Sequence, residues 1–372
     1  MNHNTDINAA IKPPVRTVVH SGLWLPRLTA IRVLAVLVIA MGYASTMPLG
    51  PQAHEIGAHL GYQPSWIGVQ ILFFFSGLLA LRSLQAGRYG WTYLKSRIRS
   101  TWPVLIAITA SVVLVVYPMC ADVGQWNVAT LLSLATYFFL TITGLDPGRP
   151  LPGLLDDAAY TCLIQGAIWT LRWGLVFHIG AAVLGRYHKL IQPPVLLGLS
   201  VLTTGSYVAI TYLAVQNDWQ NLIAIITALR LAYAFVIGMT VWAYRDKLPT
   251  SLTVKTAVIA TAFVIATAHH YLGPWSPLIE ISLCVAWGYS AYLLATSTTP
   301  KLSWADNWPA LTAALYMLNW PIAQLLLMGF PNMSGPQLVG MTLPLTVLIA
   351  GLLYGAMTGR LLRKITVQTA RL

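Results

Sequence analysis

Charged residues are scarce in this sequence, and acidic residues are the scarcest of all. Among its 372 residues, 22 are lysine or arginine and only 10 are aspartate or glutamate, so charged residues make up 9% of the chain. A soluble domain contains about a quarter charged residues, because charged side chains cover its water-facing surface. This composition therefore excludes a soluble globular protein.

Cysteine is also rare, with three residues in the chain. Cys120, Cys162 and Cys284 are scattered in or beside apolar runs and lack the spacing typical of a metal site. We therefore expect buried thiols, with neither disulfides nor a bound metal. The stretch HEIGAH (54–59) is interpreted as loop polarity rather than as a set of metal ligands. Residues 1–26 lack the apolar core of a secretory signal peptide, so we predict a short cytoplasmic tail there.

Hydrophobic residues make up 57% of the chain and gather in long apolar runs. A membrane-spanning helix needs about 20 consecutive apolar residues, and many runs reach that length. We therefore predict an all-α, polytopic integral membrane helical bundle with no soluble domain and no internal repeat. The apolar segments lie near residues 28–47, 65–84, 103–121, 127–145, 165–185, 193–214, 221–243, 252–270, 276–296, 308–329 and 336–358.

Lysine and arginine orient these segments, because they collect in cytoplasmic loops. They occur in both tails and in the loops after the second, fifth and seventh segments. The loops at 48–64, 215–220, 271–275 and 330–335 contain none. The net charge of +12 is therefore explained by membrane orientation, and we expect no nucleic-acid partner.

The interval 122–185 decides the number of spans. With a cytoplasmic N-terminus, all basic loops lie inside only if this interval crosses the membrane an odd number of times. It holds two apolar segments, so either one is re-entrant or interfacial, as 127–145 could be, or a third short span lies within LPGLLDDAAYTCLI. We predict about ten transmembrane helices within a domain at 27–358, both termini cytoplasmic, and a C-terminal tail at 359–372.

The first apolar segment carries Arg32 near its start and Tyr43 well inside it. Eleven helical residues return to within about 20° of the starting direction and rise about 16.5 Å, so both side chains share one face. That arrangement suits a cleft entering from the cytoplasm, with a cation at its mouth and a hydroxyl deeper in. The alternative is an Arg32 that snorkels to the interface and a Tyr43 in the interfacial aromatic belt.

Ionisable residues inside apolar segments are costly, and they mark candidate functional sites. The innermost are Arg32, Arg172, His178, Arg230 and Glu280. Glu280 could instead pair with an arginine and tie helices together. Both interpretations are open on the sequence alone.

Six short motifs occur in a fixed order along the chain. They are IRVLAVLVIAM (31–41), GVQILFFFSGLLALRSL (68–84), YLKSRIRSTWPVLI (93–106), AIWTLRWGLVFH (167–178), LRLAYAFVIGM (229–239) and LYMLNWPI (315–322). Together they resemble the membrane-bound acyltransferase family 3 over nearly the whole chain. Bacterial members of that family O-acylate exopolysaccharides, lipopolysaccharide, peptidoglycan and other envelope glycans. The family's ten-helix core agrees with the span count obtained from charge.

The resemblance implies which residues bind the acyl donor or the substrate. Four motifs of the family have counterparts in this chain. They are an SGF signature in the second span, a basic run that opens the third span, a W-[ST]-L stretch and a YL-x-H-x-P motif. The positions in this chain that it assigns to donor or substrate binding are Ser76, Gly77, Arg82, Arg97, Arg99, Trp169, Arg172 and Asn319.

Three departures fall on positions that would move protons. Tyr43 and Asn319 each replace a histidine of the family, and Gly174 replaces a glutamate. Tyrosine, with a reference pKa of about 10, is a poor base at neutral pH. His178 stands where the family usually has tyrosine, so we predict that His178 is the base, that Tyr43 orients it or the acceptor, and that Arg32 completes the catalytic set. A histidine that only hydrogen-bonds within the bundle is the alternative.

The resemblance therefore implies an acyltransferase, for groups other than amino-acyl groups, expected in the bacterial inner (cytoplasmic) membrane. The resemblance implies an acyl-CoA-type donor, suited to arginine, and an acyl group, expected to be acetyl, passed to a hydroxyl of an envelope polysaccharide or lipid-linked sugar. No bound cofactor is expected. Expected partners are membrane lipid, the glycan acceptor and other polysaccharide-assembly proteins. The alternative is a catalytically degenerate relative that serves as a scaffold or translocation component of exopolysaccharide assembly.

Overall fold

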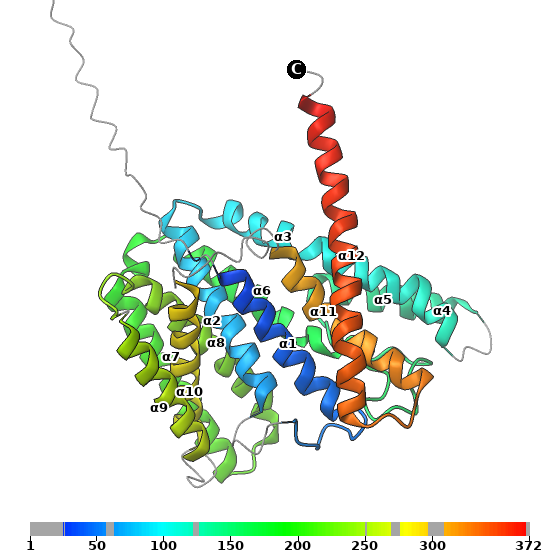
Figure 1. Cartoon of the computed structure of the whole chain (residues 1–372), viewed down its shortest axis with the longest axis horizontal. Coiled ribbons are helices and arrows are strands. Elements are labelled where there is room, and N and C mark those ends of the chain that lie inside the picture. The colour runs from blue at the N-terminus through cyan, green and yellow to red at the C-terminus, as the bar shows by residue number, and fades with distance from the viewer. Residues whose placement is uncertain are drawn as a thin grey trace, which may run out of the picture.

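The computed structural model describes Leu25 and residues 27–56, 63–121, 126–249, 251–268, 276–296 and 309–369. Every regular element in these ranges is a helix (Figure 1). The α-helices are α1 (Leu28–Thr46), α2 (Pro64–Gln85), α3 (Gly90–Ser111), α4 (Tyr117–Cys120), α5 (Val128–Thr143), α6 (Thr170–Leu184), α7 (Pro193–Gln216), α8 (Ile223–Ala243), α9 (Leu252–Ala268), α10 (Ser276–Ala295), α11 (Pro309–Gly329) and α12 (Gly335–Thr369). A short π-helix, η2 (Val112–Val116), follows α3. Three short 3₁₀ helices complete the set in these ranges: η3 (Gly166–Trp169), η4 (His188–Ile191) and η5 (Gln220–Leu222).

Nine helical segments in the described ranges are long and apolar enough to cross a membrane. One of them runs from Gly90 to Cys120 and combines α3, η2 and α4. The remaining apolar helices are α9, with 17 residues, and α5, with 16. α9 reaches only the lower end of the about 17–25 residues that a span takes, so a tenth span stays a prediction. The prediction of an all-α, multi-pass membrane bundle is thus confirmed.

Local sequence signals explain several helix ends. α2 begins at Pro64, whose fixed φ and missing N–H suit the first helical position. Asn127 caps α5, because its side-chain oxygen accepts a hydrogen bond of 2.9 Å from the backbone N–H of Thr130. Gly144 ends α5 in the left-handed conformation, with φ of 72°.

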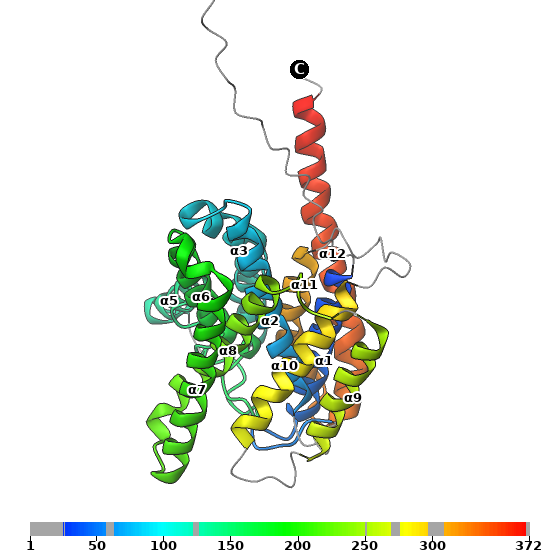
Figure 2. The ribbon, with the colours of Figure 1, turned by 90° about the vertical axis from the view of Figure 1, so that its left-hand side faces the viewer.

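The first and last helices are antiparallel. Gly335, the first residue of α12, lies against the backbone of Ser45 near the end of α1. The start of α1 and the end of α12 therefore lie at the same end of the bundle (Figure 1, Figure 2). This agrees with termini on one side of the membrane, and their cytoplasmic placement stays a prediction.

α12 is longer than a membrane is thick. Its 35 residues correspond to about 52 Å of helix, against about 30 Å of hydrocarbon core. Its C-terminal part projects beyond the other helices in both views (Figure 1, Figure 2). The tail predicted at 359–372 is therefore helical as far as Thr369.

Two glycines let α2 and α8 approach to backbone contact. A Cβ added at Gly77 of α2 would overlap the carbonyl oxygen of Phe235 in α8, and one added at Gly238 of α8 would overlap that of Phe74 in α2. The sequence assigned Gly77 to donor binding. The structure corrects this, because the role of Gly77 is to let two spans cross closely.

We expect Gly77→Ala to destabilise the protein by about 1–3 kcal/mol, because the new methyl group overpacks a backbone contact that cannot yield. Thermal melting of the purified protein in detergent measures the loss. Gly180→Ala in α6 is the matched control, since a Cβ there meets no atom within 4 Å and alanine favours helix by up to about 1 kcal/mol. Equal melting temperatures for the two variants would contradict the crossing contact.

A polar cluster centred on Glu280 ties four helices together. Its carboxylate in α10 pairs with the Arg230 guanidinium of α8 at 2.5 and 2.6 Å. It also accepts hydrogen bonds from the hydroxyls of Tyr207 in α7 (2.6 Å) and Tyr233 in α8 (3.1 Å), and from the Gln70 amide of α2 (3.2 Å). The helix-tying interpretation of Glu280 is therefore the one that the structure supports.

Candidate functional site

A cavity of about 420 Å³ lies among α1, α2, α3, α6 and α11. We call it the basic cavity, because Arg32 of α1, Arg97 of α3 and His178 of α6 line it. Ser76 of α2 lines it as well. Four residues singled out in the sequence, each from a different helix, therefore meet in one place.

The positive charge of the basic cavity is not balanced by nearby acids. Its lining contains no aspartate or glutamate, and in the described part of the chain neither Arg32 nor Arg97 forms an ion pair. Arg97 instead donates hydrogen bonds to the Leu79 carbonyl oxygen (2.9 Å) and the Ser83 hydroxyl (3.1 Å). Half-buried guanidinium groups without carboxylates nearby favour the binding of an anion.

The rest of the basic cavity is mostly apolar, as ligand sites commonly are. At Gly174 a Cβ would meet no atom within 4 Å, so open space stands where the family resemblance implies a glutamate. The site therefore suits an anionic ligand that also carries hydrocarbon. The apolar walls include Leu72, Phe73, Leu79, Leu94 and Leu175.

His178 is held by a tyrosine of α3. The Tyr93 hydroxyl and the His178 Nδ1 atom lie 2.7 Å apart, and the imidazole also packs edge-on against Phe235, with ring centroids 5.5 Å apart. Among the described residues, Nε2 of His178 has no hydrogen-bond partner. The bond at Nδ1 therefore orients the ring and leaves Nε2 to exchange a proton with a ligand.

Tyr43 does not meet His178, and this part of the predicted site was wrong. The Tyr43 ring packs edge-on against Trp320, with centroids 5.2 Å apart, and lines a different cavity. A hydrogen bond of 2.8 Å between the side chains of Thr170 and Tyr316, which line the basic cavity, closes its wall on that side. Tyr93, rather than Tyr43, is the tyrosine that contacts His178, and the alternative role of Tyr43, orienting the acceptor, stays a prediction.

The second cavity, of about 530 Å³, lies at the other end of α1. Five aromatic side chains, from α1, α2, η3, α11 and the loop before η3, line it together with the carboxylate of Glu55. We call it the aromatic cavity. Its rings are those of Tyr43, Trp66, Tyr160, Trp169 and Trp320. Trp169, assigned by resemblance to substrate binding, thus lies here rather than beside Arg32.

Arg82 and Arg99 lie outside both cavities. Arg82 is near the end of α2, with its guanidinium carbon 5.7 Å from the centre of the Trp242 ring. Arg99 is exposed on α3. Neither side chain lines the cavity that Arg97 lines, so the structure does not bring them to the site where donor binding was predicted.

Arg172 and Asn319 are also directed elsewhere. Arg172 is 44% exposed and lies 3.5 Å from the carboxylate of Asp146, and it also donates to the Leu145 carbonyl oxygen. Asn319 is buried within α11, where its amide donates to the Tyr316 carbonyl oxygen at 2.6 Å. Both were predicted to bind substrate, but neither lines the basic cavity, and local partners occupy the Arg172 guanidinium and the Asn319 amide nitrogen.

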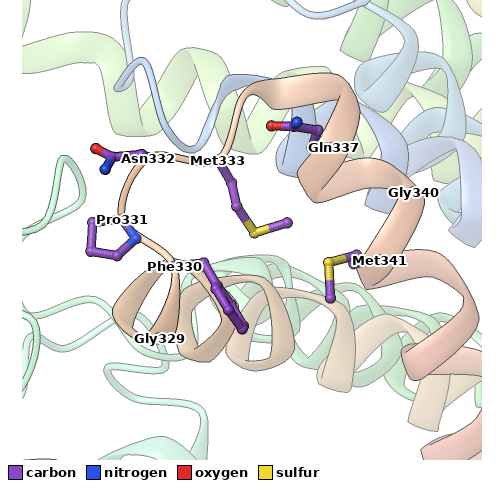
Figure 3. A pocket seen from close by; sticks show the side chains of 8 residues that line it. All are labelled: Gly329, Phe330, Pro331, Asn332, Met333, Gln337, Gly340 and Met341. Atoms are coloured by element: carbon purple, nitrogen blue, oxygen red, sulfur yellow. The ribbon is translucent and has the colours of Figure 1, made fainter.

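A third cavity, of about 670 Å³, lies at the turn between α11 and α12. Figure 3 shows the side chains of Phe330, Met333 and Met341 around it. Gln337 there accepts hydrogen bonds from Ser334. None of the residues lining this cavity titrates near neutral pH, so it offers no acid–base chemistry.

Two site residues were missed in the sequence. Tyr93 begins the motif YLKSRIRS and precedes Arg97 by four residues, a spacing that places both on one helix face. Glu55 is one of only ten acidic residues and lies in the stretch interpreted as loop polarity. It is 7% exposed, and burial raises the pKa of its carboxyl.

Comparison of the chain with protein-family models, curated proteins and solved structures finds no match. The resemblance to membrane-bound acyltransferases therefore stays a prediction, and function is argued from the cavities.

Proposed function

We propose that this protein is an integral membrane O-acyltransferase that takes an acyl group from a cytoplasmic acyl-CoA-type donor. The acceptor is a hydroxyl of an envelope polysaccharide or a lipid-linked sugar, and the membrane is the bacterial inner membrane. The observation that carries this proposal is the meeting of Arg32, Arg97 and His178 in one cavity without a carboxylate.

Each part of the basic cavity has a task in such a reaction. Arg32 and Arg97 bind the donor's phosphates, for which guanidinium groups are well shaped. The apolar walls accept the pantetheine arm and the acyl chain. Nε2 of His178 accepts the proton of the attacking hydroxyl as the ester bond forms and the thioester C–S bond breaks, and it returns a proton to the departing thiolate.

Donor binding tests the proposal directly. We expect the purified protein to bind coenzyme A in a thermophoresis titration, and the variant Arg32→Gln/Arg97→Gln to bind at least about tenfold more weakly, since each charge-assisted hydrogen bond contributes about 1.5–3 kcal/mol. Arg172→Gln is the matched control, because its guanidinium pairs with Asp146 outside the cavity. Absence of binding by the native protein, or equal binding by all three proteins, would overturn the proposal.

A translocation component of polysaccharide assembly is the second candidate. It is favoured by the presence of cavities at opposite ends of α1, with the Thr170–Tyr316 contact between them. Deleting the gene separates the two functions. Loss of base-labile esters from an otherwise normal polymer supports the enzyme, and failed polymer export with esters retained supports translocation.

A further inference from the structure

The rings of the aromatic cavity stand at angles to one another. The ring centroid of Trp320 lies 5.2 Å from that of Tyr43 and 5.0 Å from that of Tyr160, and Trp66 and Trp169 are 5.8 Å apart. All three pairs are edge-to-face, the arrangement that aromatic rings prefer. Flat apolar surfaces therefore bound a space whose volume, about 530 Å³, is that of a small-molecule site.

Two of these rings are held in place by neighbouring groups. The Trp320 indole N–H donates a hydrogen bond of 2.9 Å to the Leu163 carbonyl oxygen, and the ring lies where a side chain at Gly166 would be. The Arg230 guanidinium covers Trp66, 4.1 Å from the ring centre. The cavity is therefore preformed, which lowers the entropic cost of binding.

Glu55 brings a carboxylate to this apolar space. Ser65 at the start of α2 donates to both of its oxygens, through its backbone N–H at 2.8 Å and through its hydroxyl. Gly42 of α1 leaves room for the carboxylate, since a Cβ there would overlap it. The side chains of Thr46 and Gln63 also line the cavity and add further polar groups.

We propose that the aromatic cavity binds a neutral pyranose unit, whose C–H face stacks on an indole ring and whose hydroxyl donates a hydrogen bond to Glu55. A pyranose has flat apolar faces and a rim of hydroxyls, which matches rings set around one carboxylate and an amide. As the acceptor, this sugar would reach His178 only when the Thr170–Tyr316 contact between the two cavities opens; that role rests on the proposed function, while the binding itself does not.

A quaternary ammonium ion is the other ligand that aromatic rings commonly enclose. The positive charge of the Arg230 guanidinium, 4.1 Å from the centre of the Trp66 ring, repels a second cation that would bind against that ring. Burial also raises the pKa of Glu55, which weakens the negative charge that a cation requires. Both features favour an uncharged guest.

Saturation-transfer NMR tests the proposal on the full chain in phosphatidylglycerol nanodiscs, which contain neither sugar nor choline. The probes are methyl β-D-glucopyranoside and tetramethylammonium. We expect transfer to the sugar ring protons, reduced at least fivefold in Trp320→Leu and in Glu55→Gln. Trp219→Phe, at an exposed tryptophan before α8, is the control that retains it.

The results of the NMR experiment distinguish the proposal from its alternatives. No transfer to the sugar, equal transfer in all variants, or transfer to tetramethylammonium alone would overturn the proposal. Glu55→Gln keeps an oxygen acceptor for Ser65, so it remains informative if Trp320→Leu fails to fold. Coenzyme A binding by the same proteins reports on the basic cavity alone, and it therefore separates a failed sugar site from a failed acyltransferase.

Discussion

His178→Ala should lower the rate of acyl transfer by about 10²–10⁴-fold, the usual contribution of a general base. The imidazole lines the basic cavity, and its Nε2 has no partner among the described residues. Removing it leaves the attacking hydroxyl without a proton acceptor. The measurement is the transfer of labelled acetyl from acetyl-coenzyme A to glycan in membrane vesicles, normalised to protein amount.

The control for this experiment is His188→Ala. His188 is exposed after α6 and hydrogen-bonds to Gln192 at 3.0 Å, so its loss leaves the basic cavity intact. Tyr93→Phe should give an intermediate rate, because it removes the hydrogen bond that orients the imidazole and keeps the base. An unchanged rate for His178→Ala at normal protein level rejects His178 as the base.

Glu280→Ala should destabilise the protein by about 3–5 kcal/mol, because removing one partner of a buried ion pair strands the other. The affected charge is the Arg230 guanidinium, whose side chain is 25% exposed. Two tyrosine hydroxyls lose an acceptor at the same time. Loss of folded protein during thermal or denaturant titration in detergent measures the effect.

A matched exposed pair gives the control. Asp146 is 43% exposed and lies 3.5 Å from Arg172, and such pairs contribute about 0–1 kcal/mol, so Asp146→Asn should melt close to the native protein. The double variant Glu280→Met/Arg230→Met should recover much of the lost stability, because apolar replacements of a whole buried pair are often neutral. Equal losses for Glu280→Ala and Asp146→Asn would contradict the cluster's role.

The sequence predicted the helical bundle well because the length and hydropathy of a span are local properties of the chain. Hydropathy located the helices, and of these α5, with 16 residues, and α9, with 17, are shorter than the nine candidate spans of the described ranges. The helical period also placed Arg32 and Tyr43 on one face of α1, and each lines a cavity. Such reasoning gives the direction of a side chain around its own helix.

What could not be predicted was which neighbours each side chain meets. Tyr43 was predicted to orient His178 or the acceptor, yet the Thr170–Tyr316 contact separates the cavities that Tyr43 and His178 line. The partner of Arg172 is Asp146, from the loop after α5. These relations depend on packing between segments distant in sequence, which a hydropathy pattern does not contain.

The reciprocal fit of Gly77 and Gly238 has a consequence for motion. With backbone pressed against backbone at both points, α2 is held tightly against α8. Because α2 also lines the basic cavity, we expect that wall to move least when a guest binds beside Arg32.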